Sequence, residues 1–310
     1  MRIAIVGPGA MGILVSCYLT TKGHVVTVFD RDRERAGRLA EKGLIFLKGE
    51  VETRVTPAVL HDSRAKPLHD LAIITVKAAQ TEEAAATAAR ALLPDGVALT
   101  LQNGLGGADI LAGTAGAKRV LVGTTSQGAT LLGEGVARHG GSGPTIIGPC
   151  SPGTPSRPEV VELLNAAGLE ARWEEDIYRF VWKKLAANCG INAITALTGQ
   201  KNIIIAQNTF ARQLCAEAVR ETALVAAAVG LDLGDPDQLV AWVLGVAEAT
   251  GVNRSSMGQD FDRRRPTEVE FINMAVVSYG EKYGIATPVN RTLAGLIKCV
   301  DSTRADKTGE

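Results

Sequence analysis

Short apolar runs alternate with helix-like segments over the first half of the chain. Residues Arg2–Val6 form an apolar run rich in β-branched side chains, which is typical of a strand buried in a parallel sheet. A glycine-rich turn follows, then a segment at 13–19 that fits a helix and a second strand pattern at 24–29. The alternation continues, with strands expected at 70–76, 97–101, 119–126, 129–139, 144–147 and 169–173 and helices at 81–92 and 158–167.

The pattern changes near residue 174, where the strand signals end. Helical patterns occupy about 174–197, 208–229, 236–250, 268–284 and 290–300, and glycine or proline separates them. We therefore predict an α/β Rossmann-type N-terminal domain, residues 1–175, that binds a dinucleotide. A second, all-helical C-terminal domain, residues 176–310, would serve substrate binding and dimerisation. The polar residues at 302–310 are expected to be frayed.

The turn after the first strand has the pattern GxGxxG. Gly7 allows a tight turn, Gly9 lets the backbone approach a pyrophosphate, and Gly12 lets the following helix pack closely on the strand. The phosphates would rest against the N-terminus of that helix, where free N–H groups point outward. A purely structural glycine turn is the alternative. The strand–turn–helix–strand order favours cofactor binding by Gly7, Gly9, Ala10, Met11 and Gly12.

The end of the second strand carries conflicting signals about the cofactor. Asp30 could accept hydrogen bonds from a ribose 2′-hydroxyl, which favours NAD, whereas Arg31 could pair with a 2′-phosphate, which favours NADP. Asp30 could also be the N-cap of a helix that begins near Arg33. The residues at this strand end leave the choice between NAD and NADP open.

Two polar residues follow later strands of the predicted sheet. Lys77 comes after the strand at 70–76, and Asn103 comes after the strand at 97–101. Ligands of open parallel sheets bind outside the carboxyl ends of the strands, so both residues are candidates for ligand contact. Each also has a simpler explanation, because Lys77 could be a solvated loop lysine and Asn103 could form a turn before glycine.

A polar ridge is predicted on the first helix of the second half. Lys184, Asn188 and Asn192 recur every four residues, so they lie on nearly one face of a helix whose other residues are small or apolar. An exposed polar face is the simpler explanation, but asparagine is a poor helix former and exposed faces usually carry Glu, Lys, Arg and Gln. We infer that the ridge faces a cleft for a polar substrate. There Lys184, with an ordinary lysine pKa of about 10.4, would be charged and could protonate a ketone oxygen.

Composition narrows the class of protein. The chain has 310 residues, with 33 Lys plus Arg against 33 Asp plus Glu, and this balance argues against nucleic-acid binding. No apolar stretch is long enough to span a bilayer, and the first residues lack the pattern of a secretion signal, so a cytoplasmic protein that does not bind membranes is expected. The five cysteines and four histidines are dispersed, so no metal site is predicted.

Seven short motifs along nearly the whole chain resemble those of the ketopantoate reductase (2-dehydropantoate 2-reductase) family. Their shared order and spacing carry the resemblance, because any one motif alone is modest evidence. The stretches are GPGAMG at 7–12, KAAQ at 77–80, QNGLGG at 102–107, WKKLAANCGIN at 182–192, NRSSMGQD at 253–260, PTEVEFIN at 266–273 and GIATPVN at 284–290.

The resemblance implies a role for each matching residue. Lys184 matches the family's catalytic lysine, the general acid, and Glu268 matches the acidic residue that partners it and touches the cofactor. Arg31 matches the arginine that binds the NADP phosphate, and Lys77 and Gln80 match positions beside the cofactor. The positions that hold the keto acid and its hydroxyl match Asn103, Asn188, Asn192, Asn253 and Ser256. Asn103 is also expected beside the cofactor.

Some of these matches have local explanations, and the chain departs from the family at a few positions. Glu268 could be a first-turn acid that complements a helix dipole, and Asn253 and Ser256 could cap a helix. Met274 and Ile203 stand where the family often has glycine, which allows a changed substrate pocket.

The resemblance leads to one functional prediction and two alternatives. We expect NADPH-dependent reduction of 2-dehydropantoate to pantoate, in pantothenate and coenzyme A biosynthesis, with NAD kept open because of Asp30. The first alternative is an NAD-dependent D-2-hydroxyacid dehydrogenase that acts on other branched 2-keto acids. The second is a non-catalytic NAD(P) sensor. The expected partner is a small 2-keto acid, and the apolar helices of the second half make a homodimer plausible.

Overall fold

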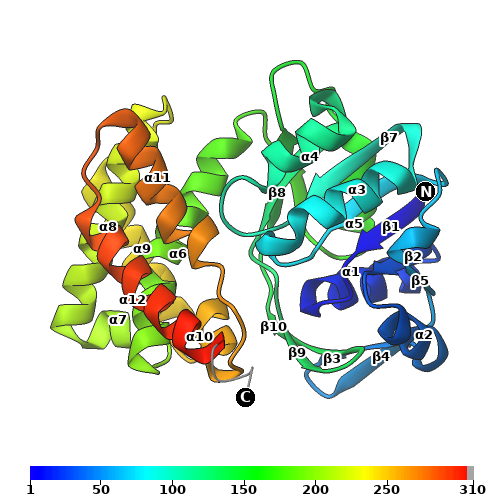
Figure 1. Cartoon of the computed structure of the whole chain (residues 1–310), viewed down its shortest axis with the longest axis horizontal. Coiled ribbons are helices and arrows are strands. Elements are labelled where there is room, and N and C mark those ends of the chain that lie inside the picture. The colour runs from blue at the N-terminus through cyan, green and yellow to red at the C-terminus, as the bar shows by residue number, and fades with distance from the viewer. Residues whose placement is uncertain (306–310) are drawn as a thin grey trace. The chain divides into compact units, whose positions relative to one another are not determined.

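The computed structural model describes residues 1–305, and these form two compact units. The first unit comprises Met1–Gln102 and Gly106–Ile177, and the second comprises Asn103–Leu105 and the chain from Tyr178 onward (Figure 1). The domain boundary expected after residue 175 therefore falls two residues before the division after Ile177. The place of Asn103–Leu105 in the second unit follows from long-range contacts, which leave no local pattern in the sequence.

The first unit contains an eight-stranded, mostly parallel sheet. In order across the sheet, its strands are β12 (Ala171–Trp173), β11 (Thr145–Pro149), β8 (Val120–Thr125), β7 (Leu92–Thr100), β6 (His69–Ile74), β1 (Arg2–Val6), β2 (Val25–Asp30) and β5 (Ala58–His61). Neighbouring strands are parallel except β8 and β11. Because β1 lies between β2 and β6, the direction of winding reverses there. Ligands of such sheets bind outside the carboxyl ends of the strands at this switch point.

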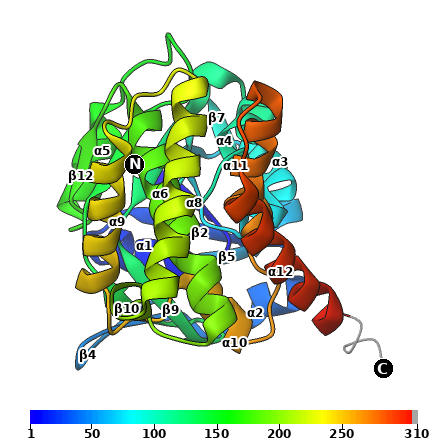
Figure 2. The same ribbon diagram turned by 90° about the vertical axis from the view of Figure 1, so that its left-hand side faces the viewer.

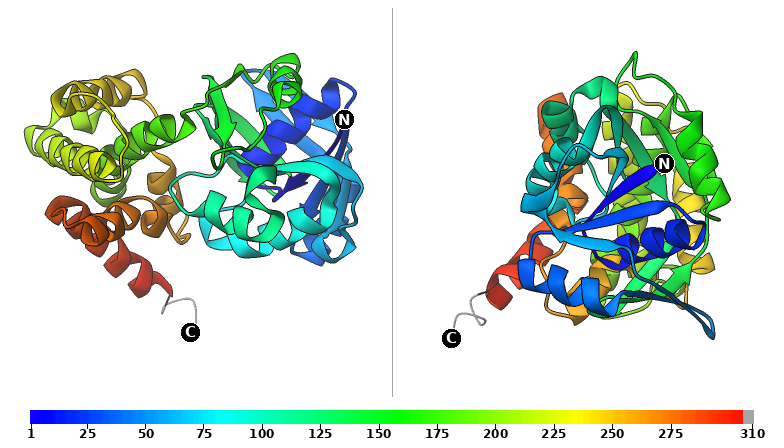
Figure 3. Two further views of the ribbon diagram at one scale, coloured as in Figure 1. Left: turned by 90° about the horizontal axis from the view of Figure 1, so that it is seen from above. Right: turned by 90° about the vertical axis from the view of Figure 1, so that its right-hand side faces the viewer.

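Helices cover both faces of this sheet (Figure 3). They are α1 (Ala10–Thr21), α2 (Arg33–Lys42), α3 (Thr81–Ala91), α4 (Gly107–Ala115) and α5 (Pro158–Ala166), with 3₁₀ turns η1 (Asp62–Arg64), η2 (Ala78–Gln80) and η3 (Ala117–Arg119). Ile13 and Leu14 of α1 and Leu163 of α5 belong to one buried apolar cluster with Ile3 and Ile5 of β1. A strand covered on both faces must be apolar on both, which explains the unbroken apolar runs in the sequence.

A separate four-stranded sheet lies beside α1 and was not predicted as a sheet. Its order is β4 (Val51–Val55), β3 (Leu44–Lys48), β10 (Val136–Gly141) and β9 (Gly128–Gly133). The strand pattern at 129–139 folds as the hairpin β9–β10, and β3 and β4 had no prediction. Strand β3 pairs in parallel with β10, so that Ile45 is the partner of Val136. The aromatic ring of Tyr18 in α1 packs 5.7 Å from that of Phe46 in β3, between ring centroids.

Helices and 3₁₀ turns are the regular elements of the second unit in its described residues (Figure 2). Its elements are α6 (Ile177–Thr198), α7 (Ile204–Gln207), α8 (Thr209–Ala228), α9 (Pro236–Ala249), α10 (Ser256–Asp262), the 3₁₀ turn η4 (Val269–Phe271), α11 (Asn273–Tyr283) and α12 (Pro288–Ala305). The short helices α7 and α10 were not predicted, and the helical pattern expected at 268–284 is divided into η4 and α11. The prediction that residues 302–310 are frayed is wrong for 302–305, because α12 continues to Ala305. Residues 306–310 lie outside the described part of the chain.

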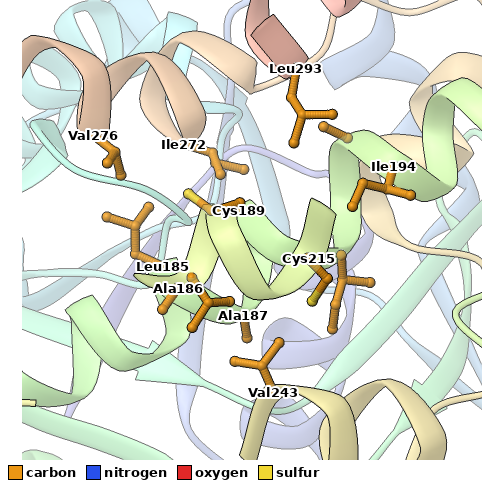
Figure 4. Close-up of a cluster of buried hydrophobic side chains, with 14 of the residues drawn as sticks. Leu185, Ala186, Ala187, Cys189, Ile194, Cys215, Val243, Ile272, Val276 and Leu293 are labelled. Carbon is orange, nitrogen blue, oxygen red and sulfur yellow. The ribbon is translucent and has the colours of Figure 1, made fainter. Parts of the chain in front are cut away.

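Helix α6 runs through the core of the second unit. Its residues Leu185 and Cys189 are buried in one cluster with Cys215 of α8, Val243 of α9 and Val276 of α11 (Figure 4). A helix that is apolar on most of its surface is typical of a core position. Lysine and asparagine side chains on such a helix are therefore out of place unless they serve a polar ligand or a buried network.

A buried polar network ties α6 to the last two helices. The carboxylate of Glu221 accepts hydrogen bonds from the backbone N–H groups of Val289 and Asn290, at 2.8 and 2.9 Å, and from the Asn290 side chain at 2.8 Å. The side-chain amide of Asn273 donates to the Asn290 side chain at 2.9 Å and to the carbonyl oxygen of Cys189 at 3.2 Å. The network joins the start of α12 to α8 and the start of α11 to α6, which fixes the register of the lysine-bearing helix.

Candidate active site

The glycine turn after β1 is packed as a dinucleotide-binding turn requires. Gly7 has a φ of +104°, and a Cβ there would lie 2.5 Å from Cγ1 of Val76. A Cβ on Gly12 would lie 2.0 Å from the carbonyl oxygen of Gly7, so α1 can meet the turn only with glycine here. The hydroxyl of Thr75, a residue that was not predicted, donates to the carbonyl oxygens of Val6 and Gly7 at 3.1 and 2.8 Å.

Gly9 differs from the other two glycines because no protein atom requires its small size. Its φ of −74° and ψ of −175° are open to any residue, and the atom nearest to a Cβ would be the Thr75 carbonyl oxygen at 3.8 Å. Gly9 is the N-cap of α1, and no side chain caps this helix. The first-turn N–H groups, in the segment that holds Ala10, Met11 and Gly12, are thus free to bind an anion. The open space and the uncapped helix fit a pyrophosphate.

Lys77 and Gln80 lie in the loop after β6, the neighbour of β1. Lys77 is exposed and precedes η2, and Gln80 ends η2 with its side chain half-buried. The side-chain amide of Gln102 holds this loop, because it donates to the carbonyl oxygen of Val76 at 3.1 Å and to the hydroxyl of Thr81 at 2.9 Å. Gln102 was not among the predicted site residues, although it follows a strand of the sheet and begins the family-like motif QNGLGG.

Asp30, at the end of β2, is buried and engaged by its neighbours. Its side chain is 1% exposed, and its two carboxylate oxygens accept from Nε and Nη2 of Arg35 at 2.5 and 2.6 Å. The backbone N–H of Asp32 donates to the same carboxylate at 3.0 Å. Asp30 does not cap α2. That N-cap is Asp32, which accepts from the backbone N–H of Arg35 at 3.0 Å, so the capping role considered for Asp30 is wrong.

Arg31, the next residue, is exposed. Its guanidinium lies 3.4 Å from the carboxylate of Glu83 in α3, and the two side chains are 55% and 65% exposed. Its carbonyl oxygen lies 3.1 Å from Nε2 of His61, the residue at the end of the neighbouring strand β5. An exposed ion pair contributes little free energy, so Arg31 can exchange Glu83 for another anion near the end of β2.

Lys184 and Glu268 form an interacting pair in the second unit. Glu268 is buried and directly precedes η4, so it is not the first-turn acid of an α-helix. Burial lowers the pKa of Lys184 to about 8, and the carboxylate of Glu268 acts in the opposite direction by raising it. Lys184 is therefore protonated at neutral pH, as expected from the sequence, but with a pKa much closer to neutrality than that of an ordinary lysine. That value suits a general acid.

The ridge on α6 contains a buried amide without a partner. Asn192 is 5% exposed, and its Nδ2 has no hydrogen-bond acceptor within residues 1–305. Leaving a buried N–H unsatisfied costs about 1–3 kcal/mol, so an acceptor on a ligand would be stabilising here. Asn188, one turn earlier, is half-buried.

The sequence analysis missed the buried Asn202. Its Nδ2 donates to the hydroxyl of Thr250 at 2.9 Å, while its Oδ1 has no partner within the described chain.

The loop that carries Asn103 packs against η4, the turn that follows Glu268. The backbone N–H of Leu105 donates to the carbonyl oxygen of Phe271 at 3.0 Å. Gly104 has a φ of +81°, and a Cβ there would lie 2.2 Å from the same carbonyl oxygen. The asparagine–glycine turn is thus real, and its close approach to η4 requires the glycine. This contact brings Asn103 to the segment that carries Glu268.

Asn253 and Ser256 are both exposed at the start of α10. The residue that caps α10 is Ser255, whose hydroxyl accepts from the backbone N–H of Gly258 at 3.0 Å, so neither Asn253 nor Ser256 has the capping role considered for it. The Ser255 hydroxyl also lies 2.7 Å from that of Thr195, one turn after Asn192 on α6. The structure therefore ties the start of α10 to the polar end of the ridge.

Other reactive side chains of the described residues do not form a metal site. Within residues 1–305, no group of three or more His, Cys, Asp or Glu side chains is placed to hold a metal ion. Burial raises the pKa of the Cys17 and Cys215 thiols to about 12, which leaves them protonated and unreactive. None of the helices in this part of the chain is both long and apolar enough to cross a membrane.

A doubly wound sheet with a GxGxxG turn, in the same chain as an interacting lysine–carboxylate pair, is typical of a dinucleotide-dependent oxidoreductase. Two family models match the chain: "Ketopantoate reductase PanE/ApbA" over residues 3–152 and "Ketopantoate reductase PanE/ApbA C terminal" over residues 176–301. The chain belongs to the ketopantoate reductase family, as the resemblance of its motifs implied.

Individual relatives cover almost the whole chain. A 2-dehydropantoate 2-reductase from Halobacterium salinarum is 37% identical over 303 residues, which are 96% of this chain and 98% of the relative. One from Vibrio cholerae is 32% identical over 98% of this chain and 99% of the relative.

Solved structures share the fold over nearly the full length. D-mandelate dehydrogenase with NADH and anilino(oxo)acetate superposes with a TM-score of 0.93, at 27% identity over 98% of this chain and 100% of that one. A ketopantoate reductase of Ralstonia eutropha JMP134 has a TM-score of 0.88, also at 27% identity over 98% of this chain and 100% of that one. Rossmann-type and helical parts therefore occur together in this family, as predicted.

Proposed function

We propose that the protein reduces 2-dehydropantoate to pantoate with NADPH, a step of pantothenate and coenzyme A biosynthesis. Curated relatives at 32–37% identity carry the name of this activity. The observation that carries the proposal in the chain itself is the interaction of half-buried Lys184 with buried Glu268, together with an unpartnered amide at Asn192 on the same helix as Lys184. These groups suit a substrate with a carbonyl and several hydrogen-bond acceptors.

Lys184 is the proposed general acid. The cofactor, when bound, supplies hydride to the keto carbon of the substrate. Negative charge then develops on the carbonyl oxygen, and the Lys184 ammonium stabilises it and donates a proton there. Glu268 raises the pKa of Lys184, which opposes the effect of burial and keeps the ammonium protonated before reaction. The partner role of Glu268 is thus electrostatic, and its proposed contact with the cofactor is additional.

Amide and hydroxyl groups are proposed to hold the keto acid. The N–H groups of Asn192 need an acceptor, and a 2-keto acid offers carboxylate, carbonyl and hydroxyl oxygens. Asn188 lies one turn away on the same ridge. Asn103 is carried by the loop packed on η4, and Asn253 and Ser256 lie where α10 begins beside Thr195. This set orients the substrate without neutralising Lys184.

NADPH is the proposed cofactor because of the residues at the end of β2. Arg31 is exposed and its guanidinium pairs with the exposed carboxylate of Glu83, so it is available to a 2′-phosphate. Asp30, which favours NAD in the sequence, has its carboxylate occupied by Arg35. Gly7, Gly9 and the first turn of α1, residues 10–12, would hold the pyrophosphate. Lys77 and Gln80 would lie beside the cofactor, from the loop after β6.

One alternative keeps specific support. A D-mandelate dehydrogenase that was solved with NADH has a TM-score of 0.93 with this chain. An NAD-dependent D-2-hydroxyacid dehydrogenase for other branched 2-keto acids is therefore the second candidate. A non-catalytic sensor has less support, because the relatives from Halobacterium salinarum and Archaeoglobus fulgidus are named as reductases and because a sensor would have no need for the Lys184–Glu268 pair.

Steady-state kinetics with two cofactors and two substrates separates the candidates. We expect kcat/KM to be highest for ketopantoate with NADPH, and at least about tenfold lower when NADH replaces NADPH, because the 2′-phosphate ion pair is worth about 1.4 kcal/mol or more. Ketoisocaproate is the matched control substrate. A preference for ketoisocaproate with NADH would instead identify the second candidate, and cofactor binding without turnover of any 2-keto acid would identify a sensor.

The pH profile tests the Lys184–Glu268 pair. At saturating cofactor, kcat/KM for the keto acid should be level near neutral pH and fall above about pH 8, as Lys184 loses its proton. Because Glu268 raises this pKa, Glu268→Gln should move the fall to lower pH. Glu270→Gln is the matched control, since Glu270 is exposed and pairs with Lys298 at 2.5 Å. The same descending limb in Glu268→Gln and in the wild type would assign the titration to another group.

A cytoplasmic location, a homodimer and the absence of nucleic-acid and membrane partners stay predictions from the sequence. Size-exclusion chromatography with light scattering measures the oligomeric state directly.

A further inference from the structure

We propose that Arg35 determines the choice between NADPH and NADH, by occupying the Asp30 carboxylate that would otherwise bind a ribose 2′-hydroxyl and repel a 2′-phosphate. This inference rests on the proposed function only in that a nicotinamide dinucleotide binds at the end of β2. It assigns Arg35 a role that neither the glycine motif nor Arg31 has. Arg35 would act through Asp30, so it is a specificity residue and not a catalytic one.

The geometry of the Asp30–Arg35 pair carries the proposal. The two side chains form a bidentate pair, with Nε and Nη2 of Arg35 at 2.5 and 2.6 Å from separate carboxylate oxygens. The backbone N–H of Asp32 also donates a hydrogen bond to Oδ1 of Asp30, at 3.0 Å. A carboxylate engaged in this way has its best acceptor directions filled, so a ribose hydroxyl gains little by approaching it.

Charge gives the second argument. A free Asp30 would place a negative charge at the strand end where a 2′-phosphate must sit, and like charges at short range are strongly unfavourable. The Asp30 side chain is 1% exposed and that of Arg35 is 39% exposed, so the carboxylate is covered while part of the guanidinium meets solvent. Arg35 uses only some of its five N–H donors on Asp30. The pair therefore presents a neutral or positive surface.

Arg31 alone does not explain phosphate selectivity. Its guanidinium is already paired, although loosely, with Glu83 at 3.4 Å. Without Arg35, the free carboxylate of Asp30 could also pair with Arg31, its neighbour in the chain. A 2′-phosphate would then compete with both Glu83 and Asp30 for the Arg31 guanidinium. Arg35 removes this competition. The conflict between Asp30 and Arg31 in the sequence is thus resolved by a residue in the first turn of α2.

Binding measurements without keto acid test the proposal, so the outcome does not depend on which substrate is reduced. Calorimetric Kd values for NADPH and NADH, and for adenosine 2′,5′-bisphosphate against AMP, are compared in wild type, Arg35→Ala, Asp30→Asn and the double variant. Arg33→Ala is the matched control, because Arg33 is an exposed arginine on the same helix. Thermal unfolding of each variant records its stability.

In Arg35→Ala, the ratio of the NADH Kd to the NADPH Kd should fall at least tenfold, because NADPH meets a bare carboxylate while NADH gains an acceptor. In the double variant, most of the loss for NADPH should disappear, since no carboxylate remains. Asp30→Asn should leave NADH affinity within about twofold of wild type, because Asp30 is not available to the ribose. Arg33→Ala should leave the ratio unchanged.

Several results would overturn the proposal. One is an equal loss of affinity for both cofactors in Arg35→Ala, which a merely structural role predicts. Another is a tenfold loss of NADH affinity in Asp30→Asn, which would show that Asp30 binds the ribose despite Arg35. Because removing Arg35 can leave a buried charge and prevent folding, the Asp30→Asn variant and the double variant, which lack that charge, decide the question in that case. Wild-type protein that prefers NADH would also contradict it. Normal cofactor selectivity without ketopantoate turnover would refute only the proposed substrate.

Discussion

Lys184→Ala should lower kcat for ketopantoate reduction by about 10²–10⁴-fold, the range for loss of a positioned general acid. No other described lysine shares its position on the α6 ridge beside Glu268. Affinity for NADPH should change little, because the proposed phosphate-binding residues belong to the first unit and Lys184 to the second. Stopped-flow or steady-state assays give kcat, and calorimetry gives the Kd for NADPH.

Lys183→Ala is the control for this variant. Lys183 is adjacent in sequence, but its ammonium lies over the ring of Trp242, 4.6 Å from the ring centroid, so it points to a different neighbour. Its removal should leave kcat near the wild-type value. If Lys184→Ala kept near-normal kcat, or if the two lysine variants lost activity equally, the role assigned to Lys184 would be wrong.

Gly9→Ala should weaken NADPH binding at least about tenfold, or about 1.4 kcal/mol, with little change in the free energy of unfolding. The backbone at Gly9 suits any residue, and a Cβ there would meet no protein atom closer than 3.8 Å. The protein therefore does not need this glycine, but a pyrophosphate that approaches the backbone does. Calorimetry for the cofactor and thermal unfolding of the free protein measure the two effects separately.

Gly12→Ala should show the opposite balance. A Cβ at Gly12 would lie 2.0 Å from the carbonyl oxygen of Gly7, a backbone atom that cannot rotate away. The free energy of unfolding should fall by about 1–3 kcal/mol from overpacking, and cofactor affinity should fall with it as the turn distorts.

The prediction for Gly9 has a clear contrary outcome. Unchanged NADPH affinity in Gly9→Ala would exclude the close approach of the pyrophosphate to this backbone and place the phosphates elsewhere.

Much of the first unit was predictable because its signals are local. Strand β1 has the predicted bounds, and α3 and α5 lie within one residue of the predictions. The continuous apolar runs indicate strands that are buried on both sheet faces, and the GxGxxG turn indicates close packing of a helix on a strand. The four-stranded sheet was not recognised because β3 pairs with β10, about ninety residues later, and such a ladder leaves no periodic trace along the chain.

The candidate site was likewise predictable only where its signals are local in the sequence. The spacing of Lys184, Asn188 and Asn192 placed them on one face of α6, because helix geometry depends only on separation along the chain. Burial could not be read from spacing, so the unpartnered Nδ2 of Asn192 and the buried Asn202 appear only in the structure.

The sequence by itself determined the Rossmann-type and helical units, the GxGxxG turn and the lysine–asparagine ridge. Each of these depends on residues that are neighbours in the chain. Only the tertiary structure decided that Glu268 lies close enough to affect the pKa of Lys184, across more than eighty residues, and that Asp30 is held by Arg35. Electrostatic and hydrogen-bond energies depend on distance in space and on burial, and folding alone sets both.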